Sequence, residues 1–250
     1  ELVGRLAAFL WRSAPDQRLF ELASRDGPIT NPELSVEVKR MLADSRSDRF
    51  ITDFTSAWIG FSKLDQIAIN PNYYRWWNPK YKDYMKLEPA AFLKTLLRED
   101  LSCLNCLSSD FMVVNDVMAK YYGAPLPASG HRFSRVPAIE GRGGILTQAA
   151  FLLAHSDGED AHAVNRGVWL RGRLLGDPPR DPPPEVPVLN DLDERDPDAA
   201  GLSTKERLSI HRKGICLDCH ADIDSWGIPM ESYDAAGKLR DKVLRLTPDQ

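Results

Sequence analysis

Residues 31–60 read NPELSVEVKRMLADSRSDRFITDFTSAWIG, and this stretch carries the clearest fold signal in the chain. Asn31 and Pro32 are typical of a helix start, with Asn as the cap and Pro in the first turn. Apolar residues then recur at the spacing of one helix face, at Leu34, Val38, Met41, Leu42, Phe50, Ile51, Phe54, Trp58 and Ile59. Gly60 predicts where this helical stretch ends. We therefore predict helices that pack through an apolar face.

The same spacing extends through the first half of the chain. A first helix is predicted with four side chains on its buried face: Leu2, Leu6, Phe9 and Leu10. Further helices are predicted over residues 19–23, 78–97 and 112–122. Pro89 lies inside the second of these and predicts a kink or a break there. We expect residues 1–126 to form a helical bundle domain of unknown function.

The pattern changes near Pro127. A short strand is predicted at 133–136, a tight turn at 142–144, and a helix over 164–175 that Gly176 ends. Residues 177–184 read DPPRDPPP, which predicts extended polyproline. A capping-box pattern at 203–206 predicts a helix that leads to Cys216. We thus predict a mainly α protein, in which the bundle is followed by a small, mostly helical domain at 127–250 with long proline-rich and irregular segments.

The composition is that of an ordinary folded chain with a mild negative charge. Of its 250 residues, 32 are Lys or Arg and 36 are Asp or Glu, so the formal net charge is −4. This balance argues against nucleic-acid binding through a basic surface. No apolar run reaches the roughly 18 residues of a membrane-spanning helix. The first residues do not follow a signal-peptide pattern and the last form no terminal element, so we interpret the chain as a section of a longer protein with flanking domains.

The most specific motif is Cys216-Leu217-Asp218-Cys219-His220. Two thiols about one helical turn apart can each form a thioether to a haem vinyl group, and the adjacent imidazole can bind the iron as proximal axial ligand. A structural disulfide, a redox dithiol and half of a zinc site are the alternatives. We predict one covalently attached haem c, with Cys216 and Cys219 as thioether anchors and His220 as the proximal ligand.

Several side chains are candidates for the sixth ligand of the iron. Met230 lies ten residues after the motif's histidine and would give a high-potential site. His162 and His155 flank an acidic stretch and would give a bis-histidine site at lower potential. His211 and His131 are expected to be packing or loop residues, although His211 lies close before the motif. Met230 and His162 are therefore the candidate distal ligands.

Three other groups have both a chemical and a structural interpretation. Cys103 and Cys106 have no histidine after them, and we expect small thiols buried in a helix or a local disulfide. The aromatic run Tyr73–Trp77 would stack on a sugar or a partner, or it would wedge a long loop onto the bundle, which we favour. The acidic stretch at 157–160 would bind a hard cation, or form a solvated turn, which we also favour.

Motifs along the chain resemble the planctomycete-type cytochrome c family. In the second half they are Arg142–Gln148, Ser156–Gly158, His162, Arg166–Leu170, Leu174–Pro179, Glu206-Arg207, His211-Arg212, Cys216–His220, Ile223-Asp224, Gly227 and Glu231–Gly237. The first half resembles the helical domain that precedes these motifs in the family, through Phe9–Trp11, Pro15-Asp16, Met41–Asp44, Trp58–Gly60 and Leu97–Asp100. The likeness spans nearly the whole chain.

The resemblance implies a large, secreted, modular protein with an attached haem and a largely uncharacterised role. The family continues beyond the position of Gln250, which agrees with a chain that is part of a longer protein. Met230 stands where the family usually has another apolar residue, which weakens it as a ligand. Cys103 and Cys106 replace aliphatic residues, which favours buried thiols. His162 stands where related sequences can carry histidine, which favours it as a ligand.

These observations lead to one expected function and two alternatives. We expect electron transfer through one haem c in the periplasm or cell envelope, with an acidic surface that docks to a positively charged redox partner. The first alternative is a haem enzyme, peroxidase-like or acting on another small substrate, with an open iron site. The second is a non-haem binding or scaffold module of the envelope that uses Tyr73–Trp77. We assign no catalytic residue and expect neither nucleic acid as a partner nor a membrane span.

Overall fold

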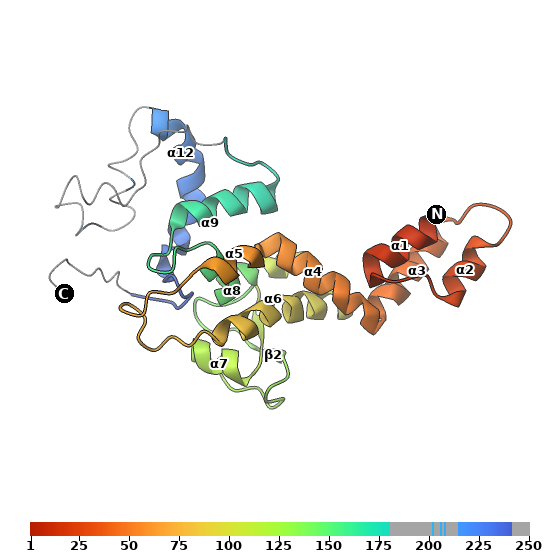
Figure 1. Ribbon diagram of the computed structural model, residues 1–250, viewed down its shortest axis with the longest axis horizontal. Helices are drawn as coiled ribbons and strands as arrows, with labels where there is room; N and C mark the ends of the chain where they lie inside the picture. The colour runs from red at the N-terminus through yellow and green to blue at the C-terminus, as the bar shows by residue number, and fades with distance from the viewer. Residues whose placement is uncertain (181–201, 203–205, 207, 209–214, 242–250) are drawn as a thin grey trace. The chain divides into compact units, whose positions relative to one another are not determined.

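The structure is a computed structural model that describes residues 1–180, 202, 206, 208 and 215–241 (Figure 1). Its elements are α1 Leu2–Trp11, α2 Gln17–Ala23, α3 Asn31–Ala43, η1 Ser45–Ser47, α4 Asp48–Ile59, α5 Phe61–Gln66, α6 Tyr81–Arg98, η2 Cys103–Cys106, β1 Phe111–Val114, α7 Asp116–Tyr122, β2 Ser134–Pro137, η3 Ile145–Thr147, α8 Ala149–Ala154, α9 Ala163–Trp169, η4 Leu170–Leu175, α12 Ile215–Gly227 and η6 Ile228–Ser232. Here η denotes a 3-10 helix, except that η4 is a π-helix. The predicted mainly α fold is confirmed.

The chain forms two compact units. The first unit contains residues 1–60 and 83–146, and the second contains 61–82 and 147–250. Residues 61–82 pack with the later part of the chain because α5 lies against α8. The capping-box residues 203–205 and the proline-rich segment from 181 onward lie outside the described residues.

The core of the first unit shows which face of α1 is buried. Its buried apolar residues are Val3, Ala7, Leu10, Trp11, Leu19 and Met41. The predicted face is wrong in part, because Leu2 and Phe9 are 47% and 63% exposed. Trp11 explains the difference: its large ring is fully buried, and its indole Nε1 donates a hydrogen bond to the carbonyl oxygen of Met41 at 3.0 Å. Burying this ring turns Phe9 toward solvent.

Helix α3 starts one residue earlier than predicted. Thr30, and not Asn31, is its cap: the Thr30 hydroxyl accepts a hydrogen bond from the backbone N–H of Glu33. The carboxylate of Glu33 accepts one from the backbone N–H of Thr30 at 2.9 Å in return. This reciprocal pair is a capping box, and it leaves Asn31 and Pro32 in the first turn. Gly60 ends α4 as predicted, in the left-handed conformation with φ 87°.

The helix predicted from Met112 to Tyr122 begins as a strand instead. β1 pairs antiparallel with β2, so that Met112 lies opposite Val136. All four residues of β1 are buried, which suits its β-branched and aromatic side chains. Only α7 is helical, and the side chain of Asn115 caps it. The strand predicted near 133–136 is confirmed as β2, and α6 runs through Pro89 without a break.

Candidate functional site

The Cys-x-x-Cys-His motif lies in the first half of α12. Positions 216 and 219 are three residues apart in this helix, which is about one turn. That spacing is the one thioether attachment to a haem requires. His220 follows directly, and it is the first residue of the motif whose surroundings can be described.

A carboxylate one turn further along α12 holds His220. The ring Nδ1 lies 2.9 Å from Oδ1 of Asp224. The side chains are 14% exposed for His220 and 1% exposed for Asp224, so the pair is largely shielded from water. With Nδ1 engaged, coordination of a metal falls to Nε2, and a metal-binding histidine usually donates its other N–H to such an acceptor. The chemistry of this pair therefore fits a haem iron bound by His220.

Two glycines let α9 and α12 pack closely (Figure 1). A β-carbon on Gly167 would lie 2.5 Å from the carbonyl oxygen of Ile223, and one on Gly227 would lie 2.0 Å from that of Ala163. Such approaches require the absence of a side chain. Because 163 meets 227 while 167 meets 223, the two helices run antiparallel. Helix α9 thus fixes the part of α12 that carries Asp224.

Arg166 holds the chain that follows α12. The side chain is fully buried, and its guanidinium donates hydrogen bonds to the carbonyl oxygens of Leu152, Met230, Tyr233 and Asp234 at 2.7–3.1 Å. Burial lowers its pKa to about 9, so it carries its charge at neutral pH. The sequence interpretation missed this role and that of Asp224. The histidine-to-aspartate spacing of four residues on a helix was the signal available for Asp224.

The two candidate distal ligands lie near the C-terminal end of α12. Met230 is 8% exposed and belongs to η6, beyond the C-terminal end of α12. His162 is half-buried and directly precedes Ala163, which contacts Gly227, so it belongs to the same end of the helix pair. Gly227 lies seven positions after His220 in this helix, which is about 10 Å along the axis. The sixth ligand stays a prediction.

The other histidines have separate surroundings. His155 lines a cleft of about 910 Å³ in the second unit and is 4% exposed. Its Nδ1 lies 2.8 Å from the carbonyl oxygen of Phe151, and its ring packs against Phe151 and Trp169. Burial lowers the pKa of His155 to about 4, so the ring is neutral at pH 7. His131 is exposed, as expected of a loop residue, and His211 lies outside the described residues.

Cys103 and Cys106 are not the buried thiols that we predicted. Cys103 is exposed, Cys106 is half-buried, and both are free. The prediction is wrong because these residues form the 3-10 turn η2 in the connection between α6 and β1, rather than part of a longer helix.

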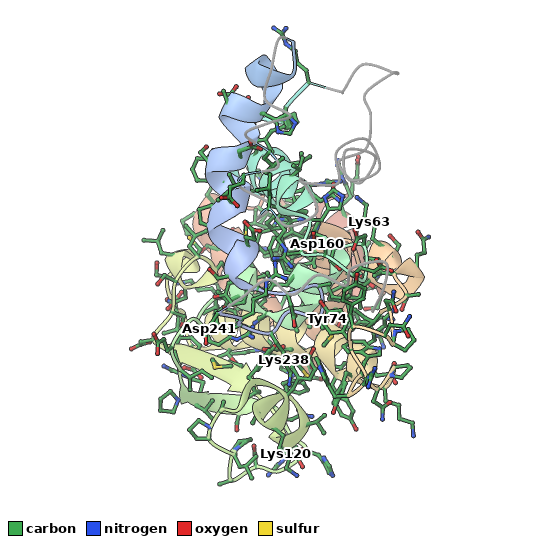
Figure 2. The ribbon with its side chains drawn as sticks, turned by 90° about the vertical axis from the view of Figure 1, so that its left-hand side faces the viewer. Lys63, Tyr74, Lys120, Asp160, Lys238 and Asp241 are labelled. Carbon is green, nitrogen blue, oxygen red and sulfur yellow. The ribbon has the colours of Figure 1, made fainter. Side chains whose placement is uncertain are left out.

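Tyr74 is the most deeply buried of the aromatic residues of the run Tyr73–Trp77, and it anchors the loop that carries them. Tyr74, labelled in Figure 2, is 7% exposed. Its hydroxyl donates to the carbonyl oxygen of Glu159 and accepts from the backbone N–H of Ala235, both at 3.1 Å. Trp76 is 42% exposed, and the Lys238 ammonium lies 4.1 Å from its ring centroid. The run thus holds its loop to the second unit, whereas we expected it to hold a loop to the bundle.

The acidic stretch at 157–160 is a turn built on its own backbone. Oδ1 of Asp157 accepts hydrogen bonds from the backbone N–H groups of Glu159 and Asp160, at 2.8 and 2.6 Å. The part of the chain that the structure describes holds no group of three or more His, Cys, Asp or Glu side chains suited to a metal ion. Within the same part, no helix has the length and hydropathy needed to span a membrane.

Comparison with known proteins finds two family matches. Residues 1–124 match the PSD4 family, described as a protein of unknown function (DUF1592), and residues 142–243 match the PSCyt3 family, described as a protein of unknown function (DUF1588). No curated protein and no solved structure matches the chain. Neither family match shows a haem domain with a Cys-x-x-Cys-His motif. The two matched families are the planctomycete-type cytochrome c domain families, and the function of both is unknown.

Proposed function

We propose that this protein is a c-type cytochrome that transfers electrons in the cell envelope through one covalently attached haem. The observation that carries the proposal is the pair formed by His220 and Asp224, directly after the two cysteine positions on α12. The family matches support it, because both belong to planctomycete-type cytochromes c. When bound, the haem iron supplies the one-electron redox couple.

Each residue of the motif has a defined task in this proposal. Cys216 and Cys219 anchor the haem as thioethers, which prevents its loss from the protein. His220 provides Nε2 as the proximal ligand. Asp224 accepts the hydrogen bond from Nδ1, which sets the tautomer and the orientation of the ring and raises the basicity of the ligand. A more basic, negatively polarised ligand favours the oxidised state of the iron.

The sixth ligand and the partner are part of the proposal. Met230 or His162 would supply the sixth ligand. The net charge of −4 suits brief docking to a positively charged redox partner through electrostatic steering. Because haem c is attached outside the cytoplasm, we place the protein in the periplasm or cell envelope.

A second candidate function is a haem enzyme acting on peroxide or another small substrate. One observation favours it over a plain carrier, namely the carboxylate on His220 Nδ1, which would increase the electron donation of the proximal ligand.

Optical spectroscopy of the chain, produced with a cytochrome c maturation system, separates the two functions. A low-spin, six-coordinate spectrum with reversible reduction supports the carrier. A high-spin, five-coordinate spectrum that changes on addition of peroxide supports the enzyme and contradicts the carrier. Met230→Ala and His162→Ala then identify the distal ligand, since only loss of the true ligand converts low-spin to high-spin iron. The exposed His131→Ala serves as the matched control.

A further inference from the structure

Cys103 and Cys106 form a pair of thiols that the proposed electron transfer does not use. They are the first and last residues of the 3-10 turn η2. A 3-10 helix has three residues per turn, so side chains three positions apart lie one above the other. Its rise of about 2.0 Å per residue puts their α-carbons about 6 Å apart, which is a separation that a disulfide bridges. The backbone of η2 therefore puts the two α-carbons within the range that a disulfide spans.

Close contacts fix the shape of this turn. The hydroxyl of Ser102 accepts a hydrogen bond from the backbone N–H of Leu104 at 3.3 Å. Gly144 approaches the turn so closely that a β-carbon there would lie 2.7 Å from the carbonyl oxygen of Cys106 and 2.9 Å from that of Asn105. Because the backbone is held on both sides, we expect η2 to keep its conformation when the pair is oxidised or reduced.

The two thiols differ in their access to a partner. Cys103 is exposed, whereas Cys106 is half-buried. Both lie at a cleft of about 890 Å³ in the first unit, lined mainly by apolar side chains of α3, α4 and α6. Burial, and to a smaller extent the neighbouring Cys103, raises the pKa of the Cys106 thiol to about 11. Cys103 is thus the thiol accessible to a partner, and Cys106 is the shielded one.

We propose that Cys103 and Cys106 are a redox-active pair that carries out thiol–disulfide exchange with an accessible disulfide, independently of any haem. The Cys103 thiolate attacks one sulfur of the disulfide RS–SR, forms Cys103–S–S–R and releases RS⁻. The Cys106 thiolate then attacks the sulfur of Cys103, closes the Cys103–Cys106 bond and releases the second RS⁻. The pair has lost two electrons and two protons, and the partner has gained them as two RSH molecules.

The geometry favours a reversible bond over a permanent one. The Cys103–Cys106 bond closes a loop of only a few residues, so it constrains the unfolded chain far less than a long-range bridge does. Because Cys103 is exposed, a partner thiol can attack the bond there, which runs the exchange in reverse.

Equilibration of the full chain with oxidised and reduced glutathione at graded ratios tests the proposal. Acid quenching, alkylation and peptide mass analysis then report the state of each cysteine. A chain with Cys216→Ser and Cys219→Ser is run in parallel, so that the result for the first pair does not depend on haem attachment. We expect interconversion between dithiol and disulfide within the range of ratios. We also expect the remaining cysteine to carry glutathione to different extents in the two serine variants. The fraction of Cys103 modified in Cys106→Ser should be at least about tenfold larger than the fraction of Cys106 modified in Cys103→Ser.

Three outcomes would overturn the proposal. A bond that stays closed at every glutathione ratio and opens only with dithiothreitol would be a structural bridge. Thiols that never pair would exclude exchange. Equal trapping of glutathione in the two serine variants would contradict the roles given to Cys103 and Cys106.

Leu104→Ala is the control, because it removes the exposed side chain next to Cys103. Its cysteines should respond to the glutathione ratio like those of the unaltered chain. Circular dichroism shows that each variant is folded.

Discussion

Gly227 on α12 lies so close to Ala163 on α9 that a β-carbon at residue 227 would fall 2.0 Å from the carbonyl oxygen of Ala163. No rotamer relieves such a contact, since it joins a β-carbon to backbone. The two helices would have to separate, which would displace α12, the helix that carries His220. The packing of α9 on α12 therefore depends on the lack of a side chain at this position.

Gly227→Ala should lower the free energy of unfolding by about 3 kcal/mol or more, because overpacking at a rigid backbone contact cannot relax. Urea denaturation followed by circular dichroism measures the effect. Gly172→Ala is the matched control, since a β-carbon there would lie 3.7 Å from the nearest atom, Cβ of Pro178. The control should change stability by less than about 1 kcal/mol. Equal effects of the two substitutions would contradict the close contact.

Arg166→Met should destabilise the second unit by about 3 kcal/mol or more, because it leaves the carbonyl oxygens that Arg166 binds buried without donors. Arg166→Lys should recover only part of this loss, since an ammonium cannot reproduce the fork of a guanidinium. Thermal unfolding compares both with Arg173→Met, which changes an exposed side chain on the following π-helix. A full recovery by lysine would show that charge alone matters at this position.

Glu88 should make the stability of the first unit depend on pH. The side chain is 1% exposed, and burial raises its pKa from 4.5 to about 8, although Tyr122 donates a hydrogen bond to it at 2.6 Å. Between these values the folded state holds a proton that the unfolded state has lost. The free energy of unfolding should therefore fall as the pH rises from about 4.5 to 8, by up to about 5 kcal/mol in total.

Glu88→Gln removes the titrating group but keeps an oxygen that can accept from Tyr122. Denaturation at a series of pH values should show a flatter stability profile for this variant than for the unaltered chain. Glu140→Gln, at an exposed position, should leave the profile unchanged. A fall in stability of the same size in Glu88→Gln would assign the pH dependence to another group.

Asp224→Asn should raise the reduction potential of the bound haem. Asparagine keeps an oxygen that can accept from Nδ1 of His220 but removes the negative charge that favours oxidised iron. We expect a rise of about 60 mV or more, which corresponds to a tenfold change in the ratio of the two oxidation states for one electron. Redox titration measures it, with Asp222→Asn as the control because the Asp222 side chain is 67% exposed. An unchanged reduction potential would show that Asp224 has only a structural role.

Local sequence patterns predicted the structural features that depend on residues close together in the chain. The apolar spacing and Gly60 predicted α3 and α4, and the Cys-x-x-Cys-His string located the candidate site. The buried face of α1 was missed because it is decided by Trp11, whose carbonyl partner Met41 lies 30 residues away. The start of α7 was missed for a similar reason, since residues 111–114 become a strand only when β2 pairs with them.

In the candidate site, too, neighbouring residues are predictable from the sequence and contacts between distant residues are not. The local string identifies His220, but the burial of Asp224 depends on how α9 packs on α12. That packing rests on Gly167 and Gly227, which are 60 residues apart in the sequence and carry no helix-face signal of their own. Arg166 binds carbonyl oxygens up to 68 residues away, a role that no local spacing predicts.

The measurement that tests the account most directly is the intact mass of the denatured, purified chain after production with a cytochrome c maturation system. We predict a mass increase equal to one haem, retained after extraction with acidified acetone. Cys216→Ser combined with Cys219→Ser should abolish the increase, and Cys103→Ser combined with Cys106→Ser should leave it intact. A chain that carries no haem, with all four cysteines free or in disulfides, would contradict the central claim.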